Sequence, residues 1–157
     1  MTNVRFSALL GALTAASCAS GGLRPVFQPL PNAATTEVSA TAAQVIPAVQ
    51  NELLKEQGLQ MQWVSPADGY LETQWYNVQT RSSANLSTGA LDQQVLFRFW
   101  VDPVAEGRSK VTGEAVWLRG WDPSREQREQ ESMVPDAHPG GQILTRIMDM
   151  LRQEYGG

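Results

Sequence analysis

The segment QQVLFRFWVDPVAEGRSKVTGEAVWL, at residues 93–118, decides the predicted fold. It contains two runs of alternating apolar and polar residues, 93–101 and 109–118, separated by the turn-forming residues 102–107. A period of two places successive side chains on opposite faces of a strand, so each run presents one apolar row to a core. The segment therefore predicts two consecutive strands that pair antiparallel across a turn.

Two further strands are predicted before this pair. Residues 59–63 alternate in the same way, and residues 70–80 continue after the turn-forming residues 66–69. Proline, aspartate and glycine between two alternating runs are typical of a hairpin. The polar residues 81–92 and 122–132 are expected to be loops.

A helix is predicted before these strands. Apolar residues recur at helical spacing over residues 42–53, and Thr41 with Gln44 forms a capping-box pattern at the start. Gly58 is well placed to end the helix in the left-handed conformation. Pro47 lacks a backbone donor, so it predicts a kink or a regular part that begins near this residue.

A last helix is predicted to begin at Pro139. Its single apolar stripe consists of Leu144, Ile147, Met148, Leu151 and Tyr155. A short edge strand is expected near residues 131–134. Together these elements predict an α+β fold: a four-stranded antiparallel meander with an N-terminal and a C-terminal helix packed on one face.

The sheet face away from the helices also carries apolar residues. Contiguous exposed apolar patches usually mark binding surfaces. The candidate interaction face consists of Leu96, Trp100, Val116, Leu118 and Trp121. In the alternative interpretation, the N-terminal segment or the long loops cover these residues, or Arg98, Thr112 and Glu114 interrupt the patch. By parity, Trp63, Trp75 and Trp117 are expected in the core.

Length and charge limit the classes of protein to which the chain can belong. A chain of 157 residues with 42% hydrophobic residues is long enough for one domain with an ordinary core. The net charge of −4 disfavours nucleic acid as a partner, because such binding depends on clustered Lys and Arg. Only two lysines are present, which disfavours electrostatic attachment to a membrane.

The N-terminus has the layout of an export signal. Arg5 precedes a run of eleven apolar or small residues, 6–16, and Cys18, the single cysteine, follows shortly after. The run is too short to cross a bilayer as a helix, which needs about 20 residues. An ordinary signal peptide that is cut after Ser17 also fits the small residues at this point.

The sequence LTAASC at residues 13–18 resembles the lipobox of bacterial lipoproteins. This resemblance implies removal of residues 1–17 and attachment of a diacylglycerol to Cys18, with acyl chains such as palmitate as the membrane anchor. Ala15 stands where the family favours leucine. The lipoprotein interpretation is preferred because a lone thiol in an exported protein otherwise needs a partner. By the same resemblance, Ala19 after the cysteine implies passage to the outer membrane, facing the periplasm.

The segment from Cys18 to about residue 39 is expected to be a flexible tether, followed by the α+β domain at residues 40–157. The tether is rich in Pro, Gly, Ala and Thr and has neither hydrophobic period. Its large apolar residues are Val26, Phe27 and Leu30. These can dock on the domain or on a partner, although a solvated linker is the preferred interpretation.

Reactive constellations are not evident, so neither an enzyme nor a cofactor is predicted. A lone histidine, His138, cannot supply a metal cage and is expected simply to start the last helix. A catalytic arrangement of Ser132, His138 and Asp136 lacks the sequence motif around the serine. The carboxylate pairs are expected to be solvated in turns and charged loops; they are Glu129 with Glu131 and Asp68 with Glu72.

The sequence DGYLETQW at residues 68–75, placed after a helix, Gly58 and an alternating strand, is similar to the helix-grip domain of the BamC (NlpB) lipoprotein family. The similarity covers roughly residues 40–118. That family belongs to the outer-membrane β-barrel assembly complex and has two such domains and a long N-terminal segment that docks on a partner. This chain has one domain and a shorter tether, so no partner-binding residue is carried over.

The predicted function is that of a non-enzymatic envelope lipoprotein, anchored in the membrane through its lipid, that binds an envelope protein as a scaffold or accessory subunit. The alternative is a carrier of a small apolar ligand or lipid, with a cavity between helices and sheet. That cavity would be lined by Trp63, Trp75, Phe97, Phe99 and Trp117. A filled core would argue against the carrier.

Overall fold

The strand pair predicted at residues 93–118 forms the centre of the sheet. A computed structural model of the chain describes residues 24–84, 86 and 90–156. Strands β6 (Gln94–Ala105) and β7 (Arg108–Leu118) pair antiparallel, with Phe97 opposite Ala115. Both strands continue further into the predicted turn than expected, so that the chain reverses at Glu106 and Gly107, where Gly107 has a φ of 68°.

The described chain is α+β, with an antiparallel sheet and three α-helices. The other strands are β1 (Ala34–Val38), β2 (Met61–Ser65), β3 (Tyr70–Thr73), β4 (Tyr76–Asn77), β5 (Ser82–Ser83) and β8 (Glu131–Met133). The helices are α1 (Ala42–Leu53), α2 (Gln127–Gln130) and α3 (Pro139–Tyr155), together with the 3-10 turn η1 (Leu91–Gln93).

The sheet has eight strands, so the predicted number of four is wrong. Its main order is β1-β7-β6-β3-β2, while β8 also pairs with β7, β4 pairs with β6, and β5 pairs with β4. β6 and β7 are long enough for two short strands to follow each other along the outer edge of each. The strand predicted at residues 70–80 is divided into β3 and β4, and β8 was expected as a short edge strand. β1 and β5 were missed, because segments of two to five residues carry little periodicity.

β1 lies within the segment that was predicted to be a flexible tether, and that prediction is wrong here. Residues 34–38 pair with Ser109–Gly113 of β7, and Val38 is buried. The order of this segment comes from backbone hydrogen bonds to β7, which composition does not reveal.

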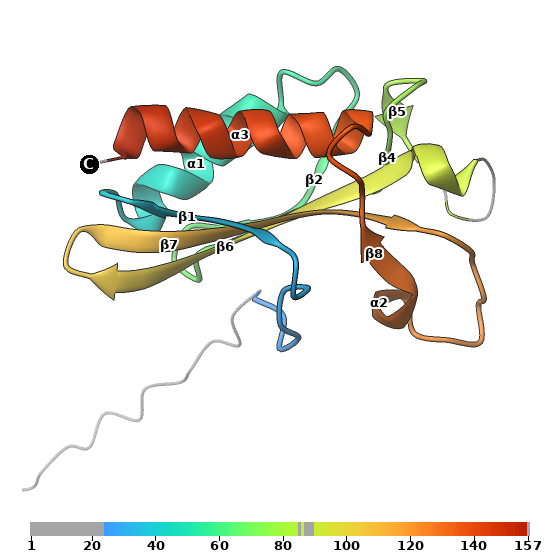
Figure 1. Cartoon of the computed structure of the whole chain (residues 1–157), viewed down its shortest axis with the longest axis horizontal. Coiled ribbons are helices and arrows are strands. Elements are labelled where there is room, and N and C mark those ends of the chain that lie inside the picture. The colour runs from blue at the N-terminus through green and yellow to red at the C-terminus, as the bar shows by residue number, and fades with distance from the viewer. Residues whose placement is uncertain (1–23, 85, 87–89, 157) are drawn as a thin grey trace, which may run out of the picture.

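Helices α1 and α3 lie on one face of the sheet (Figure 1). Both helices bury their apolar stripes against the same row of β6 and β7 side chains. The core between them includes Val45, Ile46, Val49 and Leu53 of α1, Leu144, Ile147, Met148 and Leu151 of α3, and Val95, Phe97, Phe99 and Ala115 of the sheet. No helix in the described ranges is long and apolar enough to cross a bilayer.

The start of α1 is as predicted, but its end is not. The backbone N–H of Thr41 donates to the Gln44 side chain at 3.0 Å, as in a capping box. The helix includes Pro47 and ends at Leu53, before Gly58. Gly58 has a φ of 81°, and a Cβ there would lie 2.1 Å from the carbonyl oxygen of Arg81. Gly58 therefore allows its loop to lie directly against the backbone of Arg81.

The opposite face of the sheet is covered by α2 and by residues 24–33, here called the strap (Figure 1). The strap runs across this face before the chain enters β1. Its contacts are described with the site below.

Gly113 on β7 shows how closely α3 approaches the sheet. A Cβ at this position would lie 2.8 Å from Cδ1 of Leu144 and 2.9 Å from Cε1 of Phe99. Both distances are shorter than a normal carbon contact. The helix therefore packs directly against the strand, with no room for another methyl group.

We expect the Gly113→Ala variant to be less stable than the natural chain by about 1–3 kcal/mol, because an added methyl group overpacks this contact. Urea unfolding followed by tryptophan fluorescence measures the difference. Gly120→Ala is the control, since a Cβ at Gly120 has no atom within 4 Å, and its stability should change by less than about 0.5 kcal/mol. Equal effects of the two substitutions would contradict the tight contact.

Candidate functional site

Five charged side chains form a buried group beneath the strap, here called the charged cluster. They come from β3, β6, β7, α2 and β8 and are Glu72, Arg98, Glu114, Arg128 and Glu131. Arg98 is 3% exposed and Glu114 is fully buried. Ions that leave water this completely must be paired, because an unpaired buried charge costs several kcal/mol.

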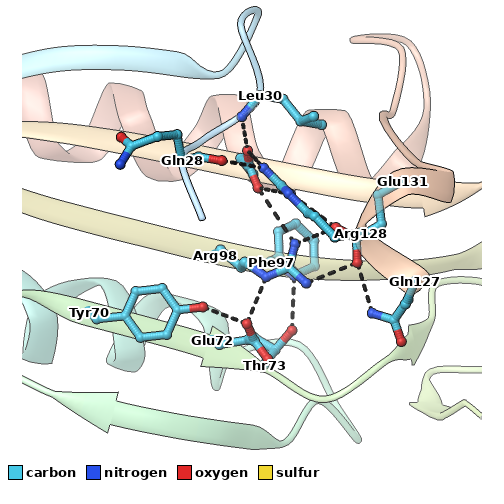
Figure 2. Close-up of polar contacts among 11 residues, drawn as sticks. Gln28, Leu30, Tyr70, Glu72, Thr73, Phe97, Arg98, Gln127, Arg128 and Glu131 are labelled. Atoms are coloured by element: carbon cyan, nitrogen blue, oxygen red, sulfur yellow. Dashed lines mark hydrogen bonds and ion pairs between the residues drawn. The ribbon is translucent and has the colours of Figure 1, made fainter. Parts of the chain in front are cut away.

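Strand register brings the centre of the charged cluster together. Arg98 of β6 lies opposite Glu72 on one side and Glu114 on the other. Its Nε donates to Glu72 Oε2 at 2.7 Å, and its Nη1 and Nη2 donate to the two oxygens of Glu131 at 2.6 and 2.9 Å (Figure 2). A guanidinium with two parallel bonds to one carboxylate is the strong geometry for such a pair.

The second arginine of the charged cluster comes from α2. Arg128 donates through Nη1 and Nη2 to the two oxygens of Glu114, both at 2.9 Å. Nη1 also donates to Glu131 at 3.0 Å, so this carboxylate lies between two arginines. α2 is only four residues long, and these bonds hold it on the sheet.

Neutral donors compensate for the remaining negative charge, since three carboxylates face two guanidinium groups. The hydroxyl of Tyr70 donates to Glu72, and the Gln127 amide donates to Glu131 at 2.8 Å. The backbone N–H of Leu30, in the strap, donates to Glu114 (Figure 2). Each carboxylate therefore has partners in addition to arginine.

The strap closes the charged cluster with an aromatic ring. The ring centroid of Phe27 lies 5.1 Å from Cζ of Arg98 and 4.7 Å from Cζ of Arg128. Both distances are within the range of a cation–π contact. The same ring meets Trp100 edge-on at 6.3 Å, and the carbonyl of Gln28 accepts from Arg128 at 2.7 Å.

Arg24, the first described residue of the strap, is attached near the C-terminal end of β6. Arg24 Nη2 lies 2.6 Å from Asp102 Oδ1, and its Nη1 donates to the carbonyl of Asp68 at 3.4 Å. The strap is therefore attached at two points, at Arg24 and at Leu30. Of the apolar residues that were considered for docking, Phe27 packs on the domain, whereas Val26 is 98% exposed.

The charged cluster favours the ionised form of Glu131. Burial by itself raises the pKa of Glu131, but the hydrogen bonds and charge of Arg98 outweigh it and hold this pKa below the ordinary 4.5. Burial and the hydrogen bond to Glu72 raise the pKa of Tyr70, so its hydroxyl stays protonated and donates. Glu131 is thus held ionised between two arginines, and the protonated Tyr70 hydroxyl serves as a donor to Glu72.

The prediction of an exposed interaction face is wrong for four of its five residues. The buried residues are Leu96, Trp100, Val116 and Leu118, each at most 3% exposed, whereas Trp121 is 37% exposed. Trp100 lies beneath Phe27 of the strap and beside Tyr70, with ring centroids 5.5 Å apart. As the alternative interpretation allowed, the N-terminal segment covers Trp100, and Arg98 and Glu114 interrupt the patch.

Trp63 was predicted to lie in the core, but it is 40% exposed. A bulge between Met61 and Trp63 shifts the register of β2 against β3. A shift of one residue moves side chains to the other face of a strand, so Met61 and Val64 pack on the core instead. Of the other two tryptophans that were predicted in the core, Trp117 packs against it, whereas Trp75 is half-buried and does not belong to the core cluster.

Trp63 and Trp75 line a surface groove of about 420 Å³, here called the tryptophan groove. Gln62, Glu72, Gln74, Leu96 and Gln127 also line it. It lies on the strap side of the sheet, at the edge formed by β2. Two indole rings with several amide groups offer both apolar contact and hydrogen bonds to a partner.

His138 caps the start of α3, as predicted. Its Nδ1 accepts from the backbone N–H of Gly140 at 3.1 Å, and its Nε2 lies 2.8 Å from the carbonyl oxygen of Asp92, to which it donates. Both ring nitrogens are thus occupied, and the structure does not bring His138 into a triad with Ser132 and Asp136. Across the part of the chain that the structure describes, no group of His, Cys, Asp and Glu could hold a metal ion. Cys18 lies outside the described residues.

The charged cluster was missed in the sequence because its members are far apart along the chain. Arg98 and Glu114 were read as interruptions of an apolar patch, and Glu72 and Glu131 as solvated residues of turns and loops. The available signal was charge parity. Arg98 and Glu114 each occupy the same strand face as apolar neighbours, which indicates charges that need a partner across the sheet.

No protein-family model matches the sequence, and no curated protein is significantly similar to it. The function is therefore inferred from the residues of the chain and their geometry.

We expect Arg98→Met to lower the free energy of unfolding by about 3–5 kcal/mol, because it leaves the carboxylates of Glu72 and Glu131 without their main partner. Arg108→Met is the matched control. Arg108 pairs with Glu37 at 2.8 Å, but both side chains are more than half exposed, so less than about 1 kcal/mol should be lost. Urea unfolding of the two variants and the natural chain measures the difference, and similar losses would contradict the role of Arg98.

Stability should fall on acidification because the pKa of Glu131 is lower in the folded chain than in the unfolded one. Because of this difference, ionised Glu131 stabilises the folded chain at pH values above the unfolded pKa of 4.5. This contribution to the free energy of unfolding is lost as the pH falls below 4.5 and through the lower pKa of the folded chain. The Glu131→Gln variant should be less stable at pH 7 and should lose less stability than the natural chain in the pH window below 4.5. Urea unfolding across the window tests this, and parallel profiles for the two proteins would contradict it.

Proposed function

We propose that this chain is a non-enzymatic lipoprotein of the bacterial cell envelope, held at the outer membrane by acyl chains on Cys18 and facing the periplasm. The lipobox-like sequence at residues 13–18, directly after a short apolar run, carries this proposal. Two acyl chains on one residue anchor a protein stably, whereas one chain binds only marginally. Removal of residues 1–17 leaves Cys18 as the first residue.

The domain acts as a protein-binding scaffold or accessory subunit. Its buried carboxylates are bonded to arginines rather than free to react, which supports a role in binding over one in catalysis. Tryptophan is enriched where proteins contribute most to binding energy. The tryptophan groove, with Trp63 exposed at the edge of the sheet, is the surface best suited to an envelope protein partner.

The carrier of an apolar ligand has less support. The carrier needs space between the helices and the sheet, but Phe97 and Phe99 are fully buried there and α3 touches β7 at Gly113. Five pockets over the described residues are open to solvent, and none of the five is lined by either phenylalanine.

Intact-mass and peptide analysis of the mature protein tests the anchor. We expect an N-terminal peptide that begins at Cys18 and carries acyl chains, and we expect the protein in the membrane fraction. The Cys18→Ala variant should lack the acyl mass and leave this fraction. A natural mature chain that is free in the periplasm and begins at an unmodified Cys18 would contradict the proposal.

Site-specific photo-crosslinking in the native envelope tests the protein partner. A photoreactive residue in place of Gln62, in the tryptophan groove, should give one discrete crosslinked protein. Trp63→Ala should reduce its yield about fivefold or more, because the loss of a central contact commonly costs about 1 kcal/mol or more. The same residue in place of Leu54 is the control, since Leu54 is exposed but outside the groove. Equal crosslinking from both positions would argue against the groove.

A further inference from the structure

The strap shortens the connection between Cys18 and the domain. Cys18 and Ala34, the first residue of β1, are 16 positions apart, which corresponds to about 55 Å of extended chain. Because the strap is attached from Arg24 onward, only the six positions from Cys18 to Arg24 remain as a connection. Six residues reach at most about 20 Å. The strap thus removes more than half of the available reach.

The point of attachment is at one end of the sheet. Arg24 pairs with Asp102 near the β6–β7 turn, and a surface pocket there is lined by Arg24, Pro103, Gly107 and Arg108. The other end of β6, at Val95, lies about 30 Å from Val104, since a strand rises about 3.3 Å per residue. β4 and β5 lie at that far end, with Tyr76 opposite both Val95 and Ser83 (Figure 1).

The end of the sheet that carries Arg24 also exposes aliphatic side chains. Val26 is 98% exposed and Val104 is 50% exposed, and each is two residues from a partner in the Arg24–Asp102 pair. The charges nearby balance, because Arg24 bonds to Asp102, Arg108 bonds to Glu37, and the exposed Glu106 and Lys110 are of opposite sign. This end therefore fits a lipid surface through short reach and apolar contact rather than through positive charge.

We propose that the strap holds the β6–β7 turn against the lipid surface, with Val26 and Val104 toward the bilayer, and directs the β4–β5 end away from it. This orientation rests on the proposed anchor at Cys18. It places the tryptophan groove, which includes Leu96 near the far end of β6, on the side available to a partner in the periplasm.

Energy transfer between the domain and labelled lipids tests the orientation. The acylated full-length mature protein is inserted into vesicles of phosphatidylethanolamine and phosphatidylglycerol that contain an acceptor lipid. A donor dye is attached to Val104→Cys in one preparation and to Ser83→Cys in the other. The dye reacts with the introduced cysteine alone, because the acylated Cys18 has no free thiol. With about 30 Å between the two sites along the sheet, transfer from position 104 should be at least about twofold higher than from position 83.

A longer connection is the control that keeps the domain intact. Twelve Gly and Ser residues inserted after Gly22 leave the strap in place but add roughly 20 Å of average reach. This insertion should bring the two transfer efficiencies close together. The double variant Arg24→Ala, Phe27→Ala should do the same by releasing the strap, with its fold checked by urea unfolding.

The outcomes separate the orientation from the anchor. Vesicle-bound protein with equal transfer from both positions, or higher transfer from position 83, overturns the orientation while the anchor stands. An unchanged difference after the insertion also overturns it, because the short connection is then not the cause. Protein that lacks acyl chains and does not float with the vesicles overturns the anchor, and the orientation with it.

Discussion

The pairing of Arg98 with its carboxylates is the constraint on which the strap side of the structure depends. A guanidinium that is 3% exposed must replace its lost water with bonds, and it does so with Glu72 of β3 and Glu131 of β8. These partners come from segments that precede and follow the central hairpin. One buried charge therefore joins β3, the central hairpin and β8 on the strap side, while apolar packing against α1 and α3 holds the other side.

The charged cluster also explains why a short helix and a short strand persist at this edge. α2 and β8 together span seven residues, too few to be stable alone. Arg128 of α2 bonds to Glu114 of β7, and Glu131 of β8 bonds to Arg98 of β6. The two elements are held by ionic bonds to the two longest strands, because their own hydrogen bonds are few.

Much of the fold follows from the sequence, since strong periodicity at residues 93–118 and after Pro139 marks long elements that bury one face. Three features could not be predicted, each for a physical reason. β1 is ordered by backbone bonds to β7, the exposure of Trp63 depends on a bulge in β2, and the charged cluster depends on the register of three strands. Side-chain patterns along one segment can mark Arg98 and Glu114 as charges on an apolar face, but they do not identify the partners, which strand register sets. The cover over Trp100 likewise follows only once the strap is placed.

The strap itself shows why a polar, aperiodic segment can be ordered. Two of its contacts with the charged cluster use backbone groups, the N–H of Leu30 and the carbonyl of Gln28. Any residue can supply the carbonyl, and any residue except proline can supply the N–H. The contacts that depend on residue type are the ring of Phe27, between two arginines, and the guanidinium of Arg24 on Asp102. The sequence requirement of the strap thus reduces to an arginine and an aromatic residue three positions apart. So sparse a pattern cannot be distinguished from a solvated linker by composition, because its partners lie on strands that are distant in sequence.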